Sequence, residues 1–540
     1  MIHNIKKTGA LMLFSSLVFS ACLSDYPKSL LPEDKAYDNA TNLYINTVAN
    51  LYHNIGGNKD SEGLQGTYRG IYDYNTFCTD EAIIPTRGGD WYDGGFWQNL
   101  YLHTWTSTDI ALYDTWCYLY KAVMMCNHSL AQIDAHKNII TPDQYNKYRA
   151  EVKALRCLFY GELLDLFGRV PLVESDEVSL DKAKQVERGE LFRFIVNELQ
   201  SSLPFLADQR SNFEGEYYGR ITRHVAEFML ARLMLNAEVY NDDNWIDGVR
   251  TLGSQILFNV DGQNMNAWEA CIHYCDRIEA AGYTLEKDYN DNFRVHNEKS
   301  HENIFTIPMD KMKYQNEFWN LFRSRHYKHG ECLGMAAENG SSATLSTVHA
   351  FAYGTDSVDT RFAFNFYSDT VHIDGKAVRQ DNGKALVYHP LVMAIDLTGS
   401  PYEKTAGARM AKYEIDRTAH ADGKLQDNDI VLFRFADVLL MRAEAKVRNS
   451  KNGQREMDAV RTRAGMPPRP ATLNNILAER LVELMWEGTR RRDLIRFGLF
   501  GNAYDIRPRL ENEQKGYTTV YPIPATALKL NRKLRQNYGY

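Results

Sequence analysis

The chain has 540 residues, a formal net charge of −7 and 12% aromatic residues, among them 33 tyrosines. A mildly acidic chain without a basic patch or stripe lacks the electrostatic footprint of a nucleic-acid-binding protein, so no nucleic-acid partner is predicted. Tyrosine joins an apolar ring to a polar tip, and its abundance favours a surface that binds a partly apolar, partly hydrated ligand.

Residues 1–21 are predicted to be a lipoprotein signal peptide. Two lysines precede an apolar run at 10–19, which is too short for a bilayer span of ~20 residues. Small residues stand directly before Cys22, as in a bacterial lipobox, although Phe19 occupies the place where leucine is commonest. We therefore predict that Cys22 is lipidated and tethers the chain to a membrane. The alternative is an ordinary signal peptide followed by a chance cysteine.

Helical periodicity dominates the rest of the chain. Apolar residues recur every three to four positions, the pattern of helices that bury one face, in five segments: 112–123, 151–167, 221–240, 432–443 and 473–485. Gly168 and Pro171 are expected to end the second of these helices. Small and large side chains alternate in the third, which favours the close approach of stacked helical hairpins. The predicted fold class is mainly α, with any repeat degenerate.

Two long segments, 60–108 and 283–430, have a different composition. They are rich in glycine, aspartate, asparagine and aromatic residues and show few sustained periods. Long irregular connections in compact proteins are usually functional or disordered, and the high aromatic content argues against disorder. We expect large ordered loops carried by a helical scaffold.

The cysteines and acids do not predict a metal or another cofactor. The seven cysteines after Cys22 are odd in number and widely spread, unlike a disulfide framework. On a helix, His273 would point away from the face that Cys271 and Cys275 share, so these cysteines are interpreted as buried small hydrophobes. The segment that starts at Asp288 begins like an EF-hand loop but lacks its glycine and its closing acid.

Arginines and acids are densest between residues 432 and 498. Glu479, Glu483 and Glu487 recur every four residues with arginines at similar spacing, the pattern of an ion-pair network on helix faces rather than of catalytic acids. Serine-hydrolase, zinc-protease, P-loop and dinucleotide motifs are not found. A paired-carboxylate glycosidase stays open at this point, because such a pair needs no local spacing.

This C-terminal block, the segment 151–173 and the segment 219–222 together resemble the SusD/RagB family of Bacteroidetes outer-membrane lipoproteins. The resemblance covers nearly the whole chain. It implies tetratricopeptide-like (TPR-like) helical hairpins that support a large, irregular, loop-rich ligand face. It also implies a single SusD-like domain over residues 22–540, with an N-terminal part at 22–215 and a C-terminal part at 216–540.

The resemblance also implies a function in polysaccharide utilisation. Such a protein would be a surface-exposed lipoprotein of the outer membrane that binds oligosaccharides and delivers them to a SusC-like TonB-dependent transporter, without catalysis. Some members resemble peptide binders, so a RagB-like peptide-uptake lipoprotein is the first alternative. A secreted glycoside hydrolase is the second.

The ligand contacts have to be chosen from chemistry, because the binding loops of the family vary most. Sugars offer an apolar ring face to aromatic side chains and hydroxyl groups to planar polar ones. The glycine-flanked segment 87–97 supplies both kinds of group, and its candidates are Arg87, Asp90, Trp91, Tyr92 and Trp97.

The second irregular segment adds Trp319 and Tyr327 as candidates, with Phe322 beside them and Glu317, Asn320 and Arg323 as possible polar partners. Alternatively, Trp91 or Trp97 could be buried and anchor the first loop to the helical scaffold. Trp105 and Trp116 are expected in the core.

Overall fold

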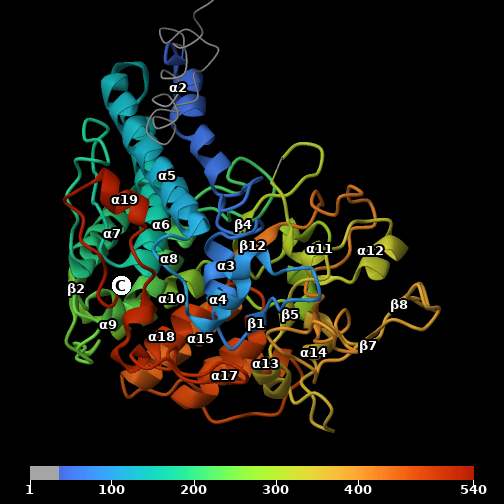
Figure 1. The fold of residues 1–540 in the computed structure, drawn as a ribbon. Coiled ribbons are helices and arrows are strands. Elements are labelled where there is room, and N and C mark those ends of the chain that lie inside the picture. The colour runs from blue at the N-terminus through green and yellow to red at the C-terminus, as the bar shows by residue number, and fades with distance from the viewer. Residues whose placement is uncertain (1–35, 315) are drawn as a thin grey trace, which may run out of the picture.

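The computed structural model describes residues 36–314 and 316–540 (Figure 1). The predicted signal peptide and Cys22 lie outside the described residues. The described part is mainly helical, which confirms the predicted fold class. Its α-helices are α2 (Ala40–Thr47), α3 (Ile71–Thr76), α4 (Phe96–Leu102), α5 (Ile110–Ala135), α6 (Pro142–Phe167), α7 (Arg188–Ser202), α8 (Arg223–Leu235), α9 (Ala237–Tyr240), α10 (Ala267–Ala280), α11 (Asn320–Ser324), α12 (Tyr327–Leu333), α13 (Leu345–Ala350), α14 (Phe362–Asn365), α15 (Phe435–Arg448), α16 (Gln454–Arg463), α17 (Leu473–Glu483), α18 (Arg490–Arg496) and α19 (Ala525–Leu530).

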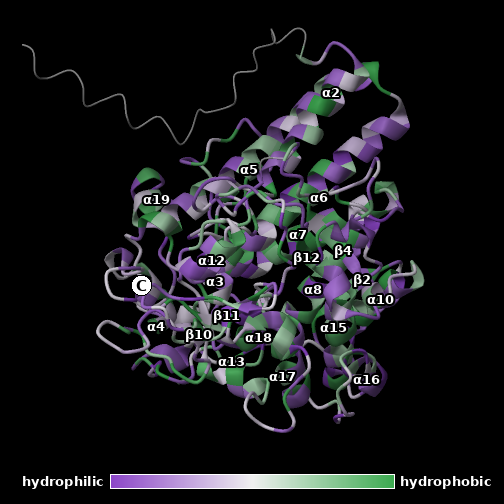
Figure 2. Ribbon diagram, turned by 90° about the vertical axis from the view of Figure 1, so that its right-hand side faces the viewer, coloured by the Kyte–Doolittle hydropathy of each residue, from purple (hydrophilic) through white to green (hydrophobic). Residues whose placement is uncertain are grey.

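The longer helices pack on one another in sequence order. Helix α5 packs on α6 and α6 on α7, while α8 packs on α10, α10 on α15, and α15 on α16 and α17. This succession of neighbouring helices agrees with TPR-like hairpins. In Figure 1 these helices fill the left and the centre, and the loop-rich part with α11, α12 and β8 projects to the right. Figure 2 shows hydrophobic and hydrophilic residues side by side along α2, α5 and α6, as expected of helices with one buried face.

The ends of helix α6 follow local chemistry. Thr141 caps its start, since the Thr141 hydroxyl accepts a hydrogen bond from the Gln144 amide over 3.2 Å and the Gln144 side chain accepts one from the Thr141 amide over 3.0 Å. Gly168 follows its last residue with φ +67°, a conformation that favours glycine. The predicted end of this helix is therefore confirmed.

The predicted helix at 432–443 is wrong at its start. Residues 432–434 belong to strand β12 (Ile430–Arg434), which pairs antiparallel with β4 (Asn303–Ile307), and helix α15 begins only at Phe435. A short apolar run is ambiguous between strand and helix, and here a partner far away in the chain provides the hydrogen bonds of a strand. Long-range pairing overrides the local period.

The strands are short and pair in twos. The pairing of β1 with β5 joins the first irregular segment, 60–108, to the second, 283–430, with Ala82 opposite Ala343. The strands are β1 (Ala82–Ile83), β2 (Leu257–Val260), β3 (Gln263–Asn266), β4 (Asn303–Ile307), β5 (Ser342–Ala343), β6 (Phe366–Tyr367), β7 (Asp369–Thr370), β8 (His372–Ile373), β9 (Lys376–Ala377), β10 (Val387–Tyr388), β11 (Arg409–Met410) and β12 (Ile430–Arg434).

A buried ion-pair network crosses the C-terminal helices. The Arg434 guanidinium contacts the carboxylates of Glu302 over 2.8 Å, Glu483 over 2.6 Å and Glu487 over 2.8 Å, and all four side chains are buried. Burial by itself would raise the pKa of Glu483, but neighbouring guanidinium groups lower it overall. The acids of this block are thus held as paired carboxylates, which confirms their interpretation as an ion-pair network.

The described residues add three findings on cysteines, metals and membranes. Cys271 and Cys275 are free and buried, as interpreted from the sequence. Across 36–314 and 316–540, no group of three or more histidine, cysteine or acidic side chains is arranged to hold a metal ion. Within the same residues no helix has the length and apolar character needed to cross a membrane.

Candidate functional site

The two loops that carry the candidate residues meet around Tyr68. The Tyr68 ring lies edge-on to Trp91, with ring centroids 6.0 Å apart, and edge-on to Trp319 at 4.4 Å. It also lies 6.2 Å from the ring of Phe322. Tyr68, Trp91, Trp319 and Phe322 are called the aromatic cluster below. Candidate rings from two distant segments thus belong to one group.

Trp91 is held in place by backbone conformation and by a glycine. Its φ of +64° lies in the left-handed region, which is uncommon for a residue other than glycine. The indole Nε1 donates a hydrogen bond to the Glu338 carbonyl oxygen over 2.8 Å. The ring lies so close to Gly340 that a β-carbon there would come within 2.6 Å of it. The half-buried Trp91 therefore has one defined orientation.

The segment before Trp319 is held by a glycine-rich loop. The Glu317 amide donates to the Gly57 carbonyl over 3.1 Å, and the Trp319 amide donates to the Gly66 carbonyl over 2.7 Å. Gly66 has φ +110°, and a β-carbon there would lie 2.4 Å from the Glu317 carbonyl oxygen. This close approach requires glycine.

Charged groups border the aromatic cluster. The Glu338 carboxylate accepts a hydrogen bond from the Tyr68 hydroxyl, and the Glu317 carboxylate accepts one from Trp319 Nε1. Burial raises the pKa of both carboxyl groups. The Lys424 ammonium lies 4.1 Å from the centre of the Trp319 ring, a cation–π contact.

A second group of polar side chains forms the outer edge of the site. The Asp90 carboxylate accepts hydrogen bonds from the Tyr327 hydroxyl over 2.5 Å and from Lys404 Nζ over 2.8 Å. Burial works against ionisation of Asp90, but these two donors lower its pKa overall. Asp90, Tyr327 and Lys404 are called the polar rim below. Tyr92 lies near it in sequence and is 60% exposed.

Other candidates lie deeper than a surface contact requires. Trp97 is fully buried, and its Nε1 donates to the Asp93 carboxylate over 2.8 Å. Arg87 is also fully buried and donates to three backbone carbonyls and to the Ser342 hydroxyl. The side chain of Trp319 is only 7% exposed. Arg87 and Trp97 are therefore placed to hold the loop in position, whereas the side chains of Tyr92 and Tyr327 are exposed.

Trp105 and Trp116 are buried at 6% and 2% exposure, which confirms that they belong to the core. Sequence reasoning did not single out Tyr68, Glu338, Lys404 or Lys424. Only Tyr68 carries a local signal, because glycines flank it at 66 and 70 just as they flank the tryptophan loop. The other three come from segments whose proximity only the fold creates.

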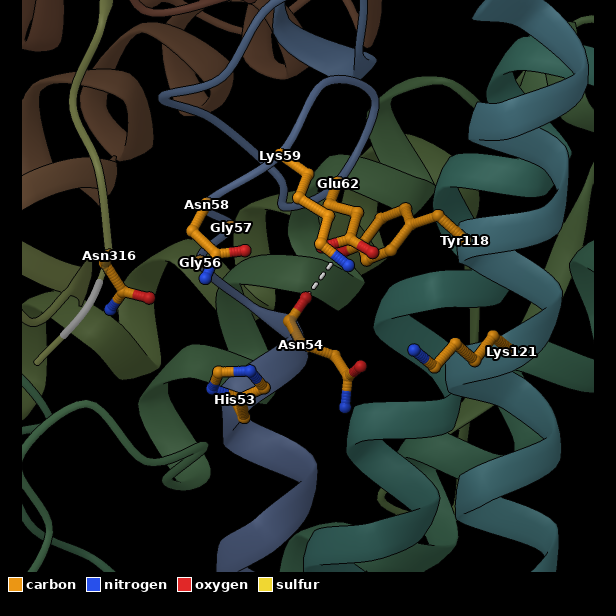
Figure 3. Close-up of a pocket in the computed structure, with 10 residues that line it drawn as sticks. All are labelled: His53, Asn54, Gly56, Gly57, Asn58, Lys59, Glu62, Tyr118, Lys121 and Asn316. Atoms are coloured by element: carbon orange, nitrogen blue, oxygen red, sulfur yellow. Dashed lines mark hydrogen bonds between the residues drawn. The ribbon is translucent and has the colours of Figure 1, made fainter. Parts of the chain in front are cut away.

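Two cavities lie beside the helices rather than on the aromatic cluster. One holds about 170 Å³ and is lined by the residues drawn in Figure 3, among them Lys59, Lys121 and Asn316. The other holds about 540 Å³ along α5 and α19, and it shares Glu62, Tyr118 and Lys121 with the first. Neither lining includes a residue of the aromatic cluster or the polar rim, so these two cavities are separate from the candidate site.

Comparison with solved structures defines the class of fold. A laminarin-binding SusD-like protein aligns over 93% of this chain and 100% of its own with a TM-score of 0.66 at 19% identity. Surface glycan-binding protein A from Bacteroides thetaiotaomicron, in complex with laminarihexaose, aligns over 92% and 99% with a TM-score of 0.69 at 18% identity. The fold is that of SusD-like proteins.

Comparison with family models and curated proteins identifies the family. The model described as the SusD family matches residues 257–540, and a model described as "starch-binding associating with outer membrane" matches residues 87–235. The starch-binding protein SusD of Bacteroides thetaiotaomicron is 24% identical over 575 residues, which cover 99% of this chain and 98% of that protein. The chain belongs to the SusD family, as its sequence motifs predicted.

Proposed function

We propose that the protein binds oligosaccharides through the aromatic cluster and the polar rim. The observation that carries this proposal is the convergence of Trp91 and Tyr327, from two distant segments of the chain, on Tyr68 and Asp90 respectively. The relatives named above include starch-, laminarin- and glycan-binding proteins, which supports a carbohydrate as the ligand.

The chemistry of the surface suits a sugar. The apolar face of a pyranose ring would pack on Trp91 and on the exposed rings of Tyr92 and Tyr327. Sugar hydroxyl groups would exchange hydrogen bonds with the Asp90 carboxylate and with the Lys404 ammonium. The ordered loops limit the entropic cost of binding, because the aromatic rings are already oriented.

The protein would act in uptake and not in catalysis. Lipid on Cys22 would hold it at the outer membrane, exposed at the cell surface, and it would pass oligosaccharides to a SusC-like TonB-dependent transporter. The description of the matched family model as associating with the outer membrane supports this location. The named relatives are binding proteins, which supports a role without bond cleavage.

Calorimetric titration of the purified protein with a panel of glycans and of protein-derived peptides tests the proposal. At least one oligosaccharide is expected to bind, with no new reducing ends after prolonged incubation. If peptides bound and no glycan did, the result would support a RagB-like role in peptide uptake instead. Appearance of reducing ends would overturn the non-catalytic assignment in favour of a glycoside hydrolase.

A further inference from the structure

Five basic side chains are buried together directly behind the polar rim. Arg87, Arg325, His326, His329 and Arg409 are each between 0 and 7% exposed, and they are called the basic cluster below. Its link to the rim is direct, because the Arg87 carbonyl accepts a hydrogen bond from Lys404 Nζ over 2.7 Å and His326 precedes Tyr327 in the chain.

The arginines of the basic cluster lack acidic partners. Among the residues that the structure describes, none of Arg87, Arg325 and Arg409 forms an ion pair with a carboxylate, whereas buried Arg323 pairs with Asp73 over 2.9 Å. An acid near the cluster, Asp381, is exposed and pairs with Lys328 instead. A buried charge without a partner is costly, so other groups have to balance these guanidinium ions.

Backbone oxygens and an aromatic ring balance two of the three arginines. Arg87 donates to three carbonyl groups and one hydroxyl, as described above. Arg409 donates to the carbonyls of Ser324 over 3.3 Å and Lys404 over 3.1 Å, and its guanidinium lies 5.1 Å from the centre of the Tyr388 ring. Arg325 has more unpaired donors, because its buried Nε and Nη2 both lack a hydrogen-bond partner among the described residues, whereas in Arg409 only Nε does.

The neighbouring His329 presents a further unmatched donor. The His326 amide donates to the Tyr388 hydroxyl oxygen over 2.9 Å, so the Tyr388 proton is available to His329 Nδ1 at 3.3 Å. That arrangement leaves the proton of a neutral imidazole on Nε2. Burial and then the charge of Arg325 lower the pKa of His329 to about 3, which keeps the ring neutral at pH 7. Its Nε2 has no partner in the described part of the chain.

We propose that a small inorganic anion of the halide class binds to Arg325 Nε and Nη2 together with His329 Nε2. Two guanidinium N–H groups and one imidazole N–H would supply hydrogen bonds, and the net positive surroundings would supply the charge. Burial selects for size: Arg325 is 3% exposed and His329 is fully buried, so an acid group carried on a bound oligosaccharide would not reach them.

Asn339 extends the same environment. Its amide donates to the Arg325 carbonyl over 2.8 Å, and its buried side-chain Nδ2 and Oδ1 have no partner among the described residues. The adjacent Glu338 accepts the hydrogen bond from Trp91. An anion on Arg325 would therefore fix the segment that also orients Trp91 and would stabilise the candidate site from behind.

Crystals grown in bromide test the proposal without any mutation. Diffraction data collected at the bromine absorption edge should show an anomalous peak beside Arg325 and His329. Ordinary difference density at that position without an anomalous peak, as a bound water molecule would give, would overturn the proposal. Bromide peaks confined to the exterior of the molecule would overturn it as well.

Thermal unfolding provides the matched solution test. Bromide is compared with gluconate, which is too large for the buried position, at equal ionic strength. Bromide at about ten times its dissociation constant should raise the folding equilibrium constant roughly tenfold in the wild-type protein. Arg325→Gln should lose this bromide-specific gain, while Arg188→Gln should keep it, because Arg188 is buried against the rings of Tyr240 and Trp245 instead.

Comparison of the two variants also separates specific binding from the general effect of salt, because that general effect acts on both variants alike. An equal bromide gain in wild type and Arg325→Gln would contradict the assignment of the site. If acetate raised the folding equilibrium constant as much as bromide does, the site would also accept a carboxylate. That result would overturn the assignment to the halide class.

Discussion

The Tyr327 hydroxyl donates a hydrogen bond to the Asp90 carboxylate over 2.5 Å and thereby joins the two irregular segments through residues 237 positions apart in the chain. Tyr68 makes a second connection between the same loops through its ring contacts with Trp91 and Trp319. The candidate binding surface thus depends on both loops at once, and changes in either are expected to affect it.

Trp91→Ala should weaken oligosaccharide binding. Loss of the ring removes the apolar contact with a sugar, at about 1.5 kcal/mol or roughly tenfold in dissociation constant. Titration calorimetry with the tightest-binding glycan of the panel measures the change, and circular dichroism checks the fold. Tyr145→Ala, which removes an aromatic ring from helix α6, should leave the affinity unchanged. Unchanged affinity in Trp91→Ala would remove this residue from the site.

Gly340→Ala should act on Trp91 indirectly. The new methyl group would lie 2.6 Å from the indole ring, so the ring has to move, and such overpacking typically costs about 1–3 kcal/mol. Glycan affinity should fall and the tryptophan fluorescence should shift. Gly89→Ala is the control, since no atom outside its two chain neighbours lies within 4 Å of a β-carbon at that position. Equal affinities in the two variants would show that the orientation of Trp91 does not control binding.

Glu483→Gln should destabilise the protein strongly without a specific effect on binding. It leaves part of the positive charge of Arg434 and Arg361 buried and unpaired, which typically costs about 3–5 kcal/mol. Denaturant unfolding measures the loss. Asp143→Asn removes an exposed ion pair with Lys147, where a change below about 1 kcal/mol is expected. Similar losses in the two variants would contradict the structural role of the network.

Asp429 should make stability depend on pH. Burial raises its pKa from 3.8 to about 7, although hydrogen bonds from Tyr218, the Met309 amide and Thr306 oppose this shift. The folded state therefore binds the proton more tightly than the unfolded state does. The resulting stability is fully present below pH 3.8 and is lost as the pH rises to about 7, at most on the order of 4 kcal/mol.

Asp429→Asn should flatten this part of the pH dependence of the unfolding free energy. The control is Asp505→Asn, which removes a carboxylate that bonds Ser346 near the surface and should leave the dependence unchanged. A slope between pH 4 and 7 that is the same in wild type and Asp429→Asn would show that this carboxyl group is not responsible.

Cys22→Ala should separate binding from location. Because the predicted lipid attaches at Cys22 and not at the aromatic cluster, the purified variant should bind glycan with wild-type affinity. Cell fractionation should find it released from the outer membrane, and growth on the cognate glycan should fail if tethering is needed for uptake. Retention of the variant in the membrane fraction would argue against lipidation at this cysteine.

The sequence by itself determined the helical scaffold, the positions of the loops and the family. Each depends on local information: apolar periods show which helix face is buried, Gly168 ends α6, and the motifs of residues 151–173 and 432–498 are contiguous. The start of α15 is an exception, because the strand residues 430–434 take their hydrogen bonds from β4.

Only the tertiary structure decided where the candidate residues lie and how far each is buried. Trp91 and Trp97 lie in one glycine-flanked loop, yet Trp91 is half-buried in the aromatic cluster and Trp97 is fully buried. The difference arises from a positive φ at Trp91 and from contacts with Glu338 and Gly340, which are distant in sequence. Local composition supplies the rings, but the direction in which each points depends on long-range packing that has no periodic signal.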